Sequence, residues 1–249
     1  MLFRSGAGNY SADITNNAAL VFNGSISQTL GGTISGSGTL TLTGGGTLTL
    51  AGINTLAGAT AVTAGKLMGV SGGSLAASDV TVSSGATLGT RTVASDGTWT
   101  CKSLTLGAGT TTAEFLFRGV TPSTTTAPLA ISGDLVNSGT LNVKVSGVMV
   151  AAGTYPLISY AGSLTAGTLG TVTLPNGGVG TLVDNTANKT IDLSVSVGGS
   201  PLVWNGDSGD WDVGVSANWT GGSTYYQEGD VVRFDDTSSG TGPFTVNLT

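Results

Sequence analysis

Apolar and small polar residues alternate along short runs of this chain, and Gly-rich stretches separate the runs. Residues 39–43 read Thr-Leu-Thr-Leu-Thr, and the same alternation returns in residues 47–50 after three consecutive Gly. A period of two predicts half-buried β-strands with their apolar side chains on one face. Two nearly identical runs joined by a turn favour a stack of similar β-coils over an isolated hairpin. We therefore expect four leucines to line an interior: Leu40, Leu42, Leu48 and Leu50.

Further short strands are predicted before residue 120, and no helical periodicity of useful length accompanies them. Gly-Ser and Gly-Gly pairs between them suit tight turns. The natural interpretation is a right-handed parallel β-helix (a β-solenoid) with Leu, Val and Ile inside and Thr and Ser outside. The predicted strands are residues 19–22, 25–30, 40–43, 48–50, 61–67, 80–82, 103–106 and 115–117.

Residues 36–67 resemble the autotransporter-associated β-strand repeat. One departure is Leu56, where that family often carries an aromatic residue. The resemblance implies the passenger region of a large bacterial autotransporter or adhesin-like surface protein, whose signal sequence and outer-membrane barrel would lie outside this chain. The positions that match the repeat are Gly36, Gly38, Leu40, Leu42, Leu48, Leu50, Gly52, Asn54, Gly58, Thr60, Val62, Gly65 and Leu67.

The character of the chain changes after residue 119, and three domains follow: a solenoid over 1–119, a β-rich closing segment over 120–199 and a truncated lead-in to a further repeat module over 200–249. Residues 141–145 and 191–197 predict longer strands. Residues 153–164 resemble the segment that closes such repeats in surface proteins. The segment 120–199 would cover the last coil, whose backbone groups are otherwise unpaired. The alternative is a continuation of the helix with a looser repeat.

Residues 200–249 hold three of the four Trp and half of the acidic residues. They resemble the segment that precedes these repeats in the same surface proteins. Three hypotheses stay open for this segment: packing of the Trp side chains as a small core, contact with a glycan, and calcium binding by Asp207, Asp210 and Asp212. The residues that carry the resemblance are Trp204, Gly206, Trp211, Asn218, Trp219, Gly229, Asp230, Val231, Phe234, Asp235 and Asp236.

Composition supports a folded chain and excludes some partners. Gly supplies 42 of 249 residues, but only 9% are charged and 39% are hydrophobic, which is unlike a disordered tract. The net charge is −6 and no basic run exists, so nucleic acid is not an expected partner. No apolar run is long enough for a membrane-spanning helix. The first residues lack a signal-peptide pattern, and both ends look cut from a longer protein.

The sequence offers little chemistry. It has no His, which removes the commonest catalytic base, and its single Cys101 predicts a buried core residue beside Trp99. The Gly-rich runs lack the Lys of a phosphate loop. Asn54 sits at a Gly-bounded turn, where its amide can satisfy backbone groups of its own and neighbouring coils. The carboxylates before residue 200 are scattered singly rather than paired for hydrolysis: Asp13, Asp79, Asp96, Glu114, Asp134, Asp184 and Asp192.

These observations predict a structural or adhesive passenger segment, secreted or displayed at the bacterial cell surface, with no catalysis. We assign no catalytic, cofactor-binding or metal-binding residue and expect no cofactor. Expected partners are host, cell-surface or glycan ligands and neighbouring repeats of the same chain. Two alternatives stay open: a carbohydrate-binding module and a β-helix polysaccharide lyase or hydrolase.

Overall fold

The computed structural model describes residues 2–3, 8–205, 209–227, 230–234 and 245–248. In these ranges the chain is nearly all β-strand, with one 3₁₀ turn, η1 (Pro175–Gly177), and no α-helix. No helix in the described part is long and apolar enough to cross a membrane.

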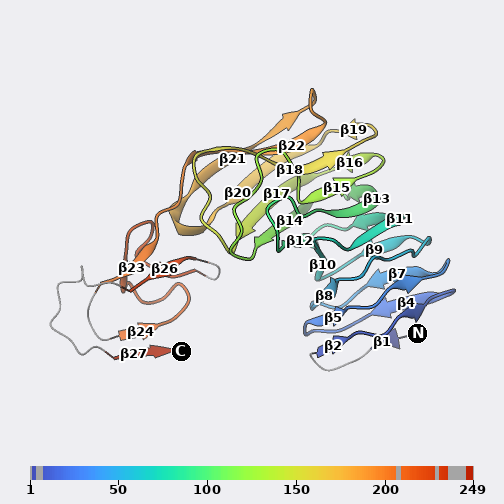
Figure 1. Cartoon of the computed structure of the whole chain (residues 1–249), viewed down its shortest axis with the longest axis horizontal. Coiled ribbons are helices and arrows are strands. Elements are labelled where there is room, and N and C mark those ends of the chain that lie inside the picture. The colour runs from blue at the N-terminus through green and yellow to red at the C-terminus, as the bar shows by residue number, and fades with distance from the viewer. Residues whose placement is uncertain (1, 4–7, 206–208, 228–229, 235–244, 249) are drawn as a thin grey trace.

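Two long sheets, built mostly of parallel strands, form the body of the molecule, residues 8–200 (Figure 1). Sheet A has twelve strands: β1 (Leu2–Phe3), β4 (Ala19–Phe22), β7 (Thr39–Leu42), β9 (Thr60–Val62), β11 (Ser74–Val82), β13 (Trp99–Leu106), β15 (Leu129–Ile131), β16 (Leu135–Asn137), β18 (Gly153–Tyr160), β19 (Leu164–Thr165), β22 (Thr190–Val197) and β21 (Val179–Asn185). Sheet B has eight: β2 (Gly8–Tyr10), β5 (Gln28–Leu30), β8 (Thr47–Leu50), β10 (Lys66–Val70), β12 (Thr87–Thr92), β14 (Thr110–Phe117), β17 (Thr140–Ser146) and β20 (Thr168–Thr173).

The chain visits the two sheets in turn and returns to each at a regular interval. In sheet A, Leu20 pairs with Leu40 and Leu40 with Thr60, so the interval is 20 residues. In sheet B, Leu30 pairs with Leu50 at the same interval. We call one such interval a circuit. A third, short sheet joins the first circuits, pairing β3 (Ile14–Thr15) with β6 (Ile34–Ser35).

Later circuits are longer. Leu88 of β12 pairs with Ala113 of β14, and Ala113 pairs with Val143 of β17, an interval of 30 residues. The added residues lengthen the strands, since β13 and β14 each have eight residues where β7 and β8 have four. The interior widens accordingly and takes larger side chains, Trp99, Phe115 and Phe117, all at most 1% exposed.

The alternating leucines are interior, as the sequence predicts. Leu40, Leu42 and Leu50 are fully buried and Leu48 is 1% exposed. The neighbouring Thr39 and Thr43 are exposed. Apolar partners one circuit apart therefore stack into continuous interior columns, which remove their surfaces from water.

The expectation that Thr and Ser lie outside is wrong for several positions. Thr60 is buried because it is in register with Leu40 on one side and Val80 on the other. Its hydroxyl is 2.8 Å from that of Ser78, which donates to the Gly58 carbonyl. These interior hydroxyls are satisfied locally, so burial costs little. The other buried members of this class are Thr49, Thr90, Thr92, Thr111, Ser146 and Thr190.

The single strand predicted for residues 61–67 is also wrong, because the structure divides it. Residues to Val62 belong to β9 of sheet A, and residues from Lys66 belong to β10 of sheet B. The corner between them contains Gly65 at φ +69°, a conformation that other residues rarely adopt. Its ideal Cβ would lie 2.3 Å from the Gly44 carbonyl oxygen of the preceding circuit, so the close stacking of corners also requires Gly.

Parallel pairing ends within the segment predicted to close the stack. Strand β18 pairs antiparallel with β22, and β22 pairs antiparallel with β21. This hairpin extends sheet A beyond the last parallel strands, and its buried residues Ile191, Leu193 and Val195 join the main core. Val197, at the end of the same predicted strand, is exposed.

The described residues after Pro201 form a separate small β-structure, which we call the C-terminal unit. It lies on the same side of the body as sheet B (Figure 1). Its strands are β23 (Leu202–Trp204), β24 (Gly209–Trp211), β25 (Trp219–Thr220), β26 (Val232–Arg233) and β27 (Val246–Leu248).

Candidate functional site

Asn54 binds backbone groups of three successive circuits. Its Oδ1 accepts a 2.8 Å hydrogen bond from the Ile34 amide of the preceding circuit. Its Nδ2 donates to the carbonyls of Gly52 in its own circuit and Ser74 in the next, both at 2.9 Å. The side chain is 2% exposed, so these bonds are shielded from competing water. The role predicted for Asn54 is confirmed.

Two further buried Asn residues act in a related way at other corners. Asn16 accepts from the amide of Ala18 and donates to the Thr39 carbonyl of the next circuit. Asn137 accepts from the amide of Gly139 and donates to the Thr168 carbonyl. In each case an amide side chain replaces the backbone partner that a corner residue lacks.

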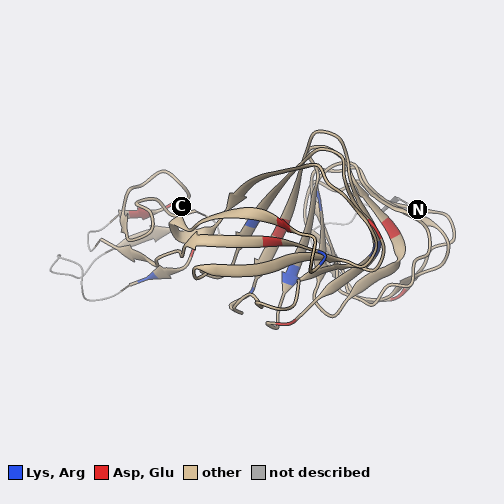
Figure 2. Ribbon diagram, turned by 90° about the horizontal axis from the view of Figure 1, so that it is seen from above, with Lys and Arg blue, Asp and Glu red and all other residues tan. Residues whose placement is uncertain are grey.

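The scattered carboxylates have local structural partners. Asp13 accepts from the Thr33 amide at 2.7 Å, and Asp134 accepts from the Ser163 amide at 2.6 Å, each one circuit later. Hydrogen bonds from Lys102 and Ser103 lower the pKa of the exposed Asp79. These carboxylates therefore fasten neighbouring circuits to one another. Figure 2 shows how sparsely charged residues are distributed over the strands.

Asp184 and Asp192 are the two acidic residues on directly paired strands. Asp184 is opposite Ile191, and Asp192 is opposite Val183. Because consecutive residues of a strand point to opposite faces, these carboxyl groups lie on opposite sides of the hairpin. They do not form the facing pair that glycoside hydrolysis needs.

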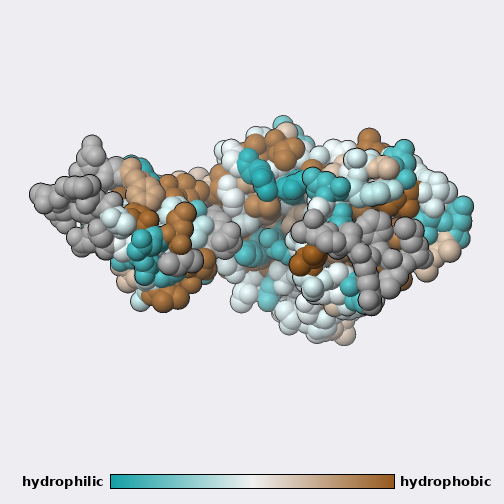
Figure 3. Space-filling view, turned by 90° about the horizontal axis from the view of Figure 1, so that it is seen from below, coloured by the Kyte–Doolittle hydropathy of each residue, from teal (hydrophilic) through white to brown (hydrophobic). Residues whose placement is uncertain are grey.

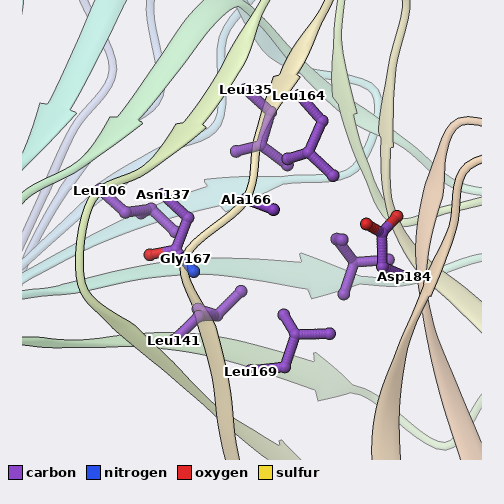
Figure 4. Close-up of a pocket in the computed structure, with 10 residues that line it drawn as sticks. Leu106, Leu135, Asn137, Leu141, Leu164, Ala166, Gly167, Leu169 and Asp184 are labelled. Carbon is purple, nitrogen blue, oxygen red and sulfur yellow. The ribbon is translucent and has the colours of Figure 1, made fainter.

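A small apolar pocket of about 100 Å³ lies beneath the hairpin, between it and the last circuits (Figure 4). Asn137 and Asp184 are its polar lining residues. Asn137 already spends its amide on the corner bonds, and the pocket is smaller than ordinary ligand sites, which span roughly 300–1,000 Å³. Its apolar lining residues are Leu106, Leu135, Leu141, Leu164, Ala166, Gly167, Leu169 and Ile191.

Cys101 is fully buried in β13, the strand that also carries Trp99, as the sequence predicts. Burial raises the pKa of its thiol to about 12, and the nearby Asp79 charge acts in the same direction. A thiol held neutral in this way is a poor nucleophile.

Trp side chains of the C-terminal unit pack against one another. Trp204 and Trp219 meet edge to face with ring centroids 5.0 Å apart, and Trp211 and Trp219 meet at 5.4 Å. Trp204 and Trp219 are 4% and 2% exposed. The packing hypothesis for these residues is confirmed.

The calcium hypothesis falls partly outside the described residues, since Asp207 is among those not described, as are Gly206, Gly229, Asp235 and Asp236. Asp210 accepts a 2.9 Å bond from Asn247. Asp212 accepts the amides of Val215 and Ser216, and the Ser216 hydroxyl lowers its pKa most. Both described carboxylates thus shape local turns. Within the described ranges no three metal-ligating side chains gather.

Asn176 joins the body to the C-terminal unit, and nothing in the sequence marks it. It adopts φ 57° within η1 and is 2% exposed. Its side-chain amide makes two bonds with the backbone of Val231, at 2.8 and 2.9 Å. Its own amide donates to Asp230 at 2.8 Å.

Comparisons with known proteins gave no match to a family model, a curated protein or a solved structure. The resemblance to autotransporter-associated repeats therefore stays a prediction.

Proposed function

We propose that the body is a right-handed parallel β-helix and that each circuit is one of its coils. The regular return of the chain to both sheets supports this proposal, because Leu20, Leu40 and Thr60 occupy equivalent places at 20-residue steps. Parallel strands joined by crossovers wind almost always in the right-handed sense.

The protein acts as a structural and adhesive passenger segment of a secreted or surface-displayed bacterial protein of the autotransporter kind. The observation that carries this proposal is the three-circuit bonding of Asn54. Bonds that tie each coil to the coils before and after it suit a rod that folds coil by coil and holds its shape without disulfides. The resemblance of residues 36–67 supplies the family.

Trp204 and Trp219 are committed to the core of the C-terminal unit, which argues against a stacking platform for sugars there. The carboxylates of the body bind neighbouring backbone amides, which argues against a lyase or hydrolase. A depolymerisation assay on neutral and acidic polysaccharides tests the enzymatic alternative directly.

A display experiment tests the proposal. The chain is placed between a signal peptide and the membrane anchor of an autotransporter, and its exposure is measured by protease accessibility on intact cells. We expect efficient display of the wild type and reduced display of Asn54→Leu. Display of Asn17→Ala, a change at an exposed corner residue, serves as the control. Retention of the wild type inside the cell would contradict the proposal.

A further inference from the structure

The charges of this chain are segregated. Residues 1–199 contain seven acidic and seven basic residues, whereas residues 200–249 contain seven acidic residues and one basic residue. The whole net charge of −6 therefore belongs to the last fifty residues, and the body is neutral overall. Within this neutral body, basic residues gather on one surface.

That surface is the outer face of sheet B, which we call the basic face. Leu67, Leu88, Phe115 and Val143 point inward from four neighbouring strands and are buried. Because side chains alternate, the residues next to them point outward. The charged ones are Lys66 on β10, Arg91 on β12, Glu114 on β14, Arg118 just after β14 and Lys144 on β17.

Three of these cations lack a partner in the described part of the chain. Lys66 forms an ion pair with Glu114. The second ion pair among the described residues, Lys102 with Asp79, lies on sheet A. Arg91, Arg118 and Lys144 thus retain uncompensated positive charge on a face that holds one acidic residue.

The spacing of these cations follows from the sheet. Arg91 is in register with Leu116 of the next strand, and Lys144 is in register with Glu114 of that same strand. Parallel strands lie about 4.8 Å apart, so Arg91 and Lys144 are two strands and roughly 10 Å apart across the sheet. Long side chains at this spacing can reach successive anionic groups of one extended polymer.

A polar cleft of about 390 Å³ opens at the Lys144 end of the basic face. It lies where the body narrows into the C-terminal unit (Figure 3), and its volume is that of an ordinary ligand site. Lys144 and Thr173 come from the body, and Ser223, Gln227 and Asp230 from the C-terminal unit. Amide, hydroxyl and carboxylate groups around one cation suit a sugar that carries both hydroxyls and a carboxylate.

We propose that the basic face and this cleft bind an acidic polysaccharide whose sugars carry carboxylates. Lys144 binds the carboxylate of the sugar in the cleft, while Gln227 and Asp230 bind its hydroxyls. Arg91 and Arg118 bind carboxylates of the sugars that continue across sheet B. This site is distinct from the Trp cluster and does not depend on the proposed route of export.

Two other polyanions fit less well. A single nucleic-acid strand binds through stacked aromatic side chains, and the outward residues of β10, β12, β14 and β17 include none. The acidic C-terminal unit of a second copy would offer Asp210 and Asp212, which are engaged in hydrogen bonds of their own. A polyuronate presents one free carboxylate on every sugar.

The test measures binding of the full chain to polygalacturonate, heparin, dextran and single-stranded DNA at several salt concentrations. We expect polygalacturonate to bind more tightly than the other three, with an affinity that falls as salt rises. The double variant Arg91→Ala/Lys144→Ala should bind polygalacturonate about tenfold or more weakly. Gln227→Ala should weaken binding without changing its salt dependence, because this side chain is neutral.

Lys102→Ala, which removes an exposed cation from sheet A, is the matched control and should bind as the wild type does. Melting temperatures of the outer-face variants establish that they fold. Unchanged affinity of the folded double variant, or equal loss in Lys102→Ala, would overturn the proposal. So would preferential binding of heparin or DNA, or salt-dependent self-association that the double variant abolishes, since each assigns the face to another occupant.

Discussion

Asn54 and Ile34 are 20 residues apart in the sequence, yet the amide of Ile34 donates a 2.8 Å hydrogen bond to Oδ1 of Asn54. The same side chain also bonds to Ser74, 20 residues further on. One buried amide thus measures the interval at which the chain repeats. The bond places residue 54 directly beside the preceding circuit and fixes the register of the corner between sheets A and B.

Loss of this side chain should destabilise the body. In Asn54→Leu, the Ile34 amide and the Gly52 carbonyl lose their partner while staying buried. We expect the free energy of unfolding to fall by about 2–4 kcal/mol. Asn17→Ala is the control: Asn17 is exposed and accepts one long 3.4 Å bond from Ser37, so its loss should cost less than about 1 kcal/mol. Equal losses in denaturant titrations would contradict the assigned role.

Leu48 and Thr47 test the facing of β8. Leu48→Asp places an unpaired charge in the interior and should cost several kcal/mol, whereas Thr47→Asp should cost roughly 0.5 kcal/mol. The measurement is chemical unfolding of both variants beside the wild type. Comparable destabilisation by the two changes would show that the facing is wrongly assigned.

The thiol of Cys101 gives a pH-dependent prediction. Its pKa rises from 9.0 to about 12 on folding, so the folded state favours the neutral thiol. The contribution of this thiol to stability is therefore complete below about pH 9 and declines as the pH rises toward 12. The free energy of unfolding of the wild type should fall more steeply in this window than that of Cys101→Ala. Parallel pH profiles of the two proteins would refute the assignment.

Asn176 should control how firmly the C-terminal unit is attached. Asn176→Gly tolerates the positive φ but removes both bonds to Val231, so we expect faster hydrogen exchange at the Val231 amide. Exchange at Leu42, deep in the body, is the internal control and should not change. Protection of Val231 equal to that of the wild type would mean that other contacts hold the junction.

Local pattern predicts the regular circuits of this fold well. Strict alternation around Leu40 and Leu48 identifies interior residues, because a one-residue shift would expose every leucine. The Gly-bounded position of Asn54 predicts its corner bonds. Both signals lie within a few residues of the feature that they predict.

Features that depend on the neighbouring circuit are less visible in the sequence. Thr60 is interior because of its register with Leu40, which no local pattern reveals. Strand β12 has one large apolar residue, Leu88, and was not predicted, since its interior also accommodates Thr90 beside Phe115. Asn176 meets Val231 from 55 residues away, so only the folded chain identifies the junction.

Cross-linking of adjacent circuits tests the central claim, that the body is a stack of 20-residue coils. Thr41 is in register with Ala61, and Ala61 with Thr81. The double variant Thr41→Cys/Ala61→Cys places two thiols on adjacent strands about 4.8 Å apart, within reach of a disulfide. Thr41→Cys/Thr81→Cys places them two strands apart, roughly 10 Å, which a disulfide cannot span. We predict that mild oxidation of the folded protein links residues 41 and 61 and leaves 41 and 81 free. Efficient linkage of 41 to 81, or none between 41 and 61, would contradict the stacked-coil account.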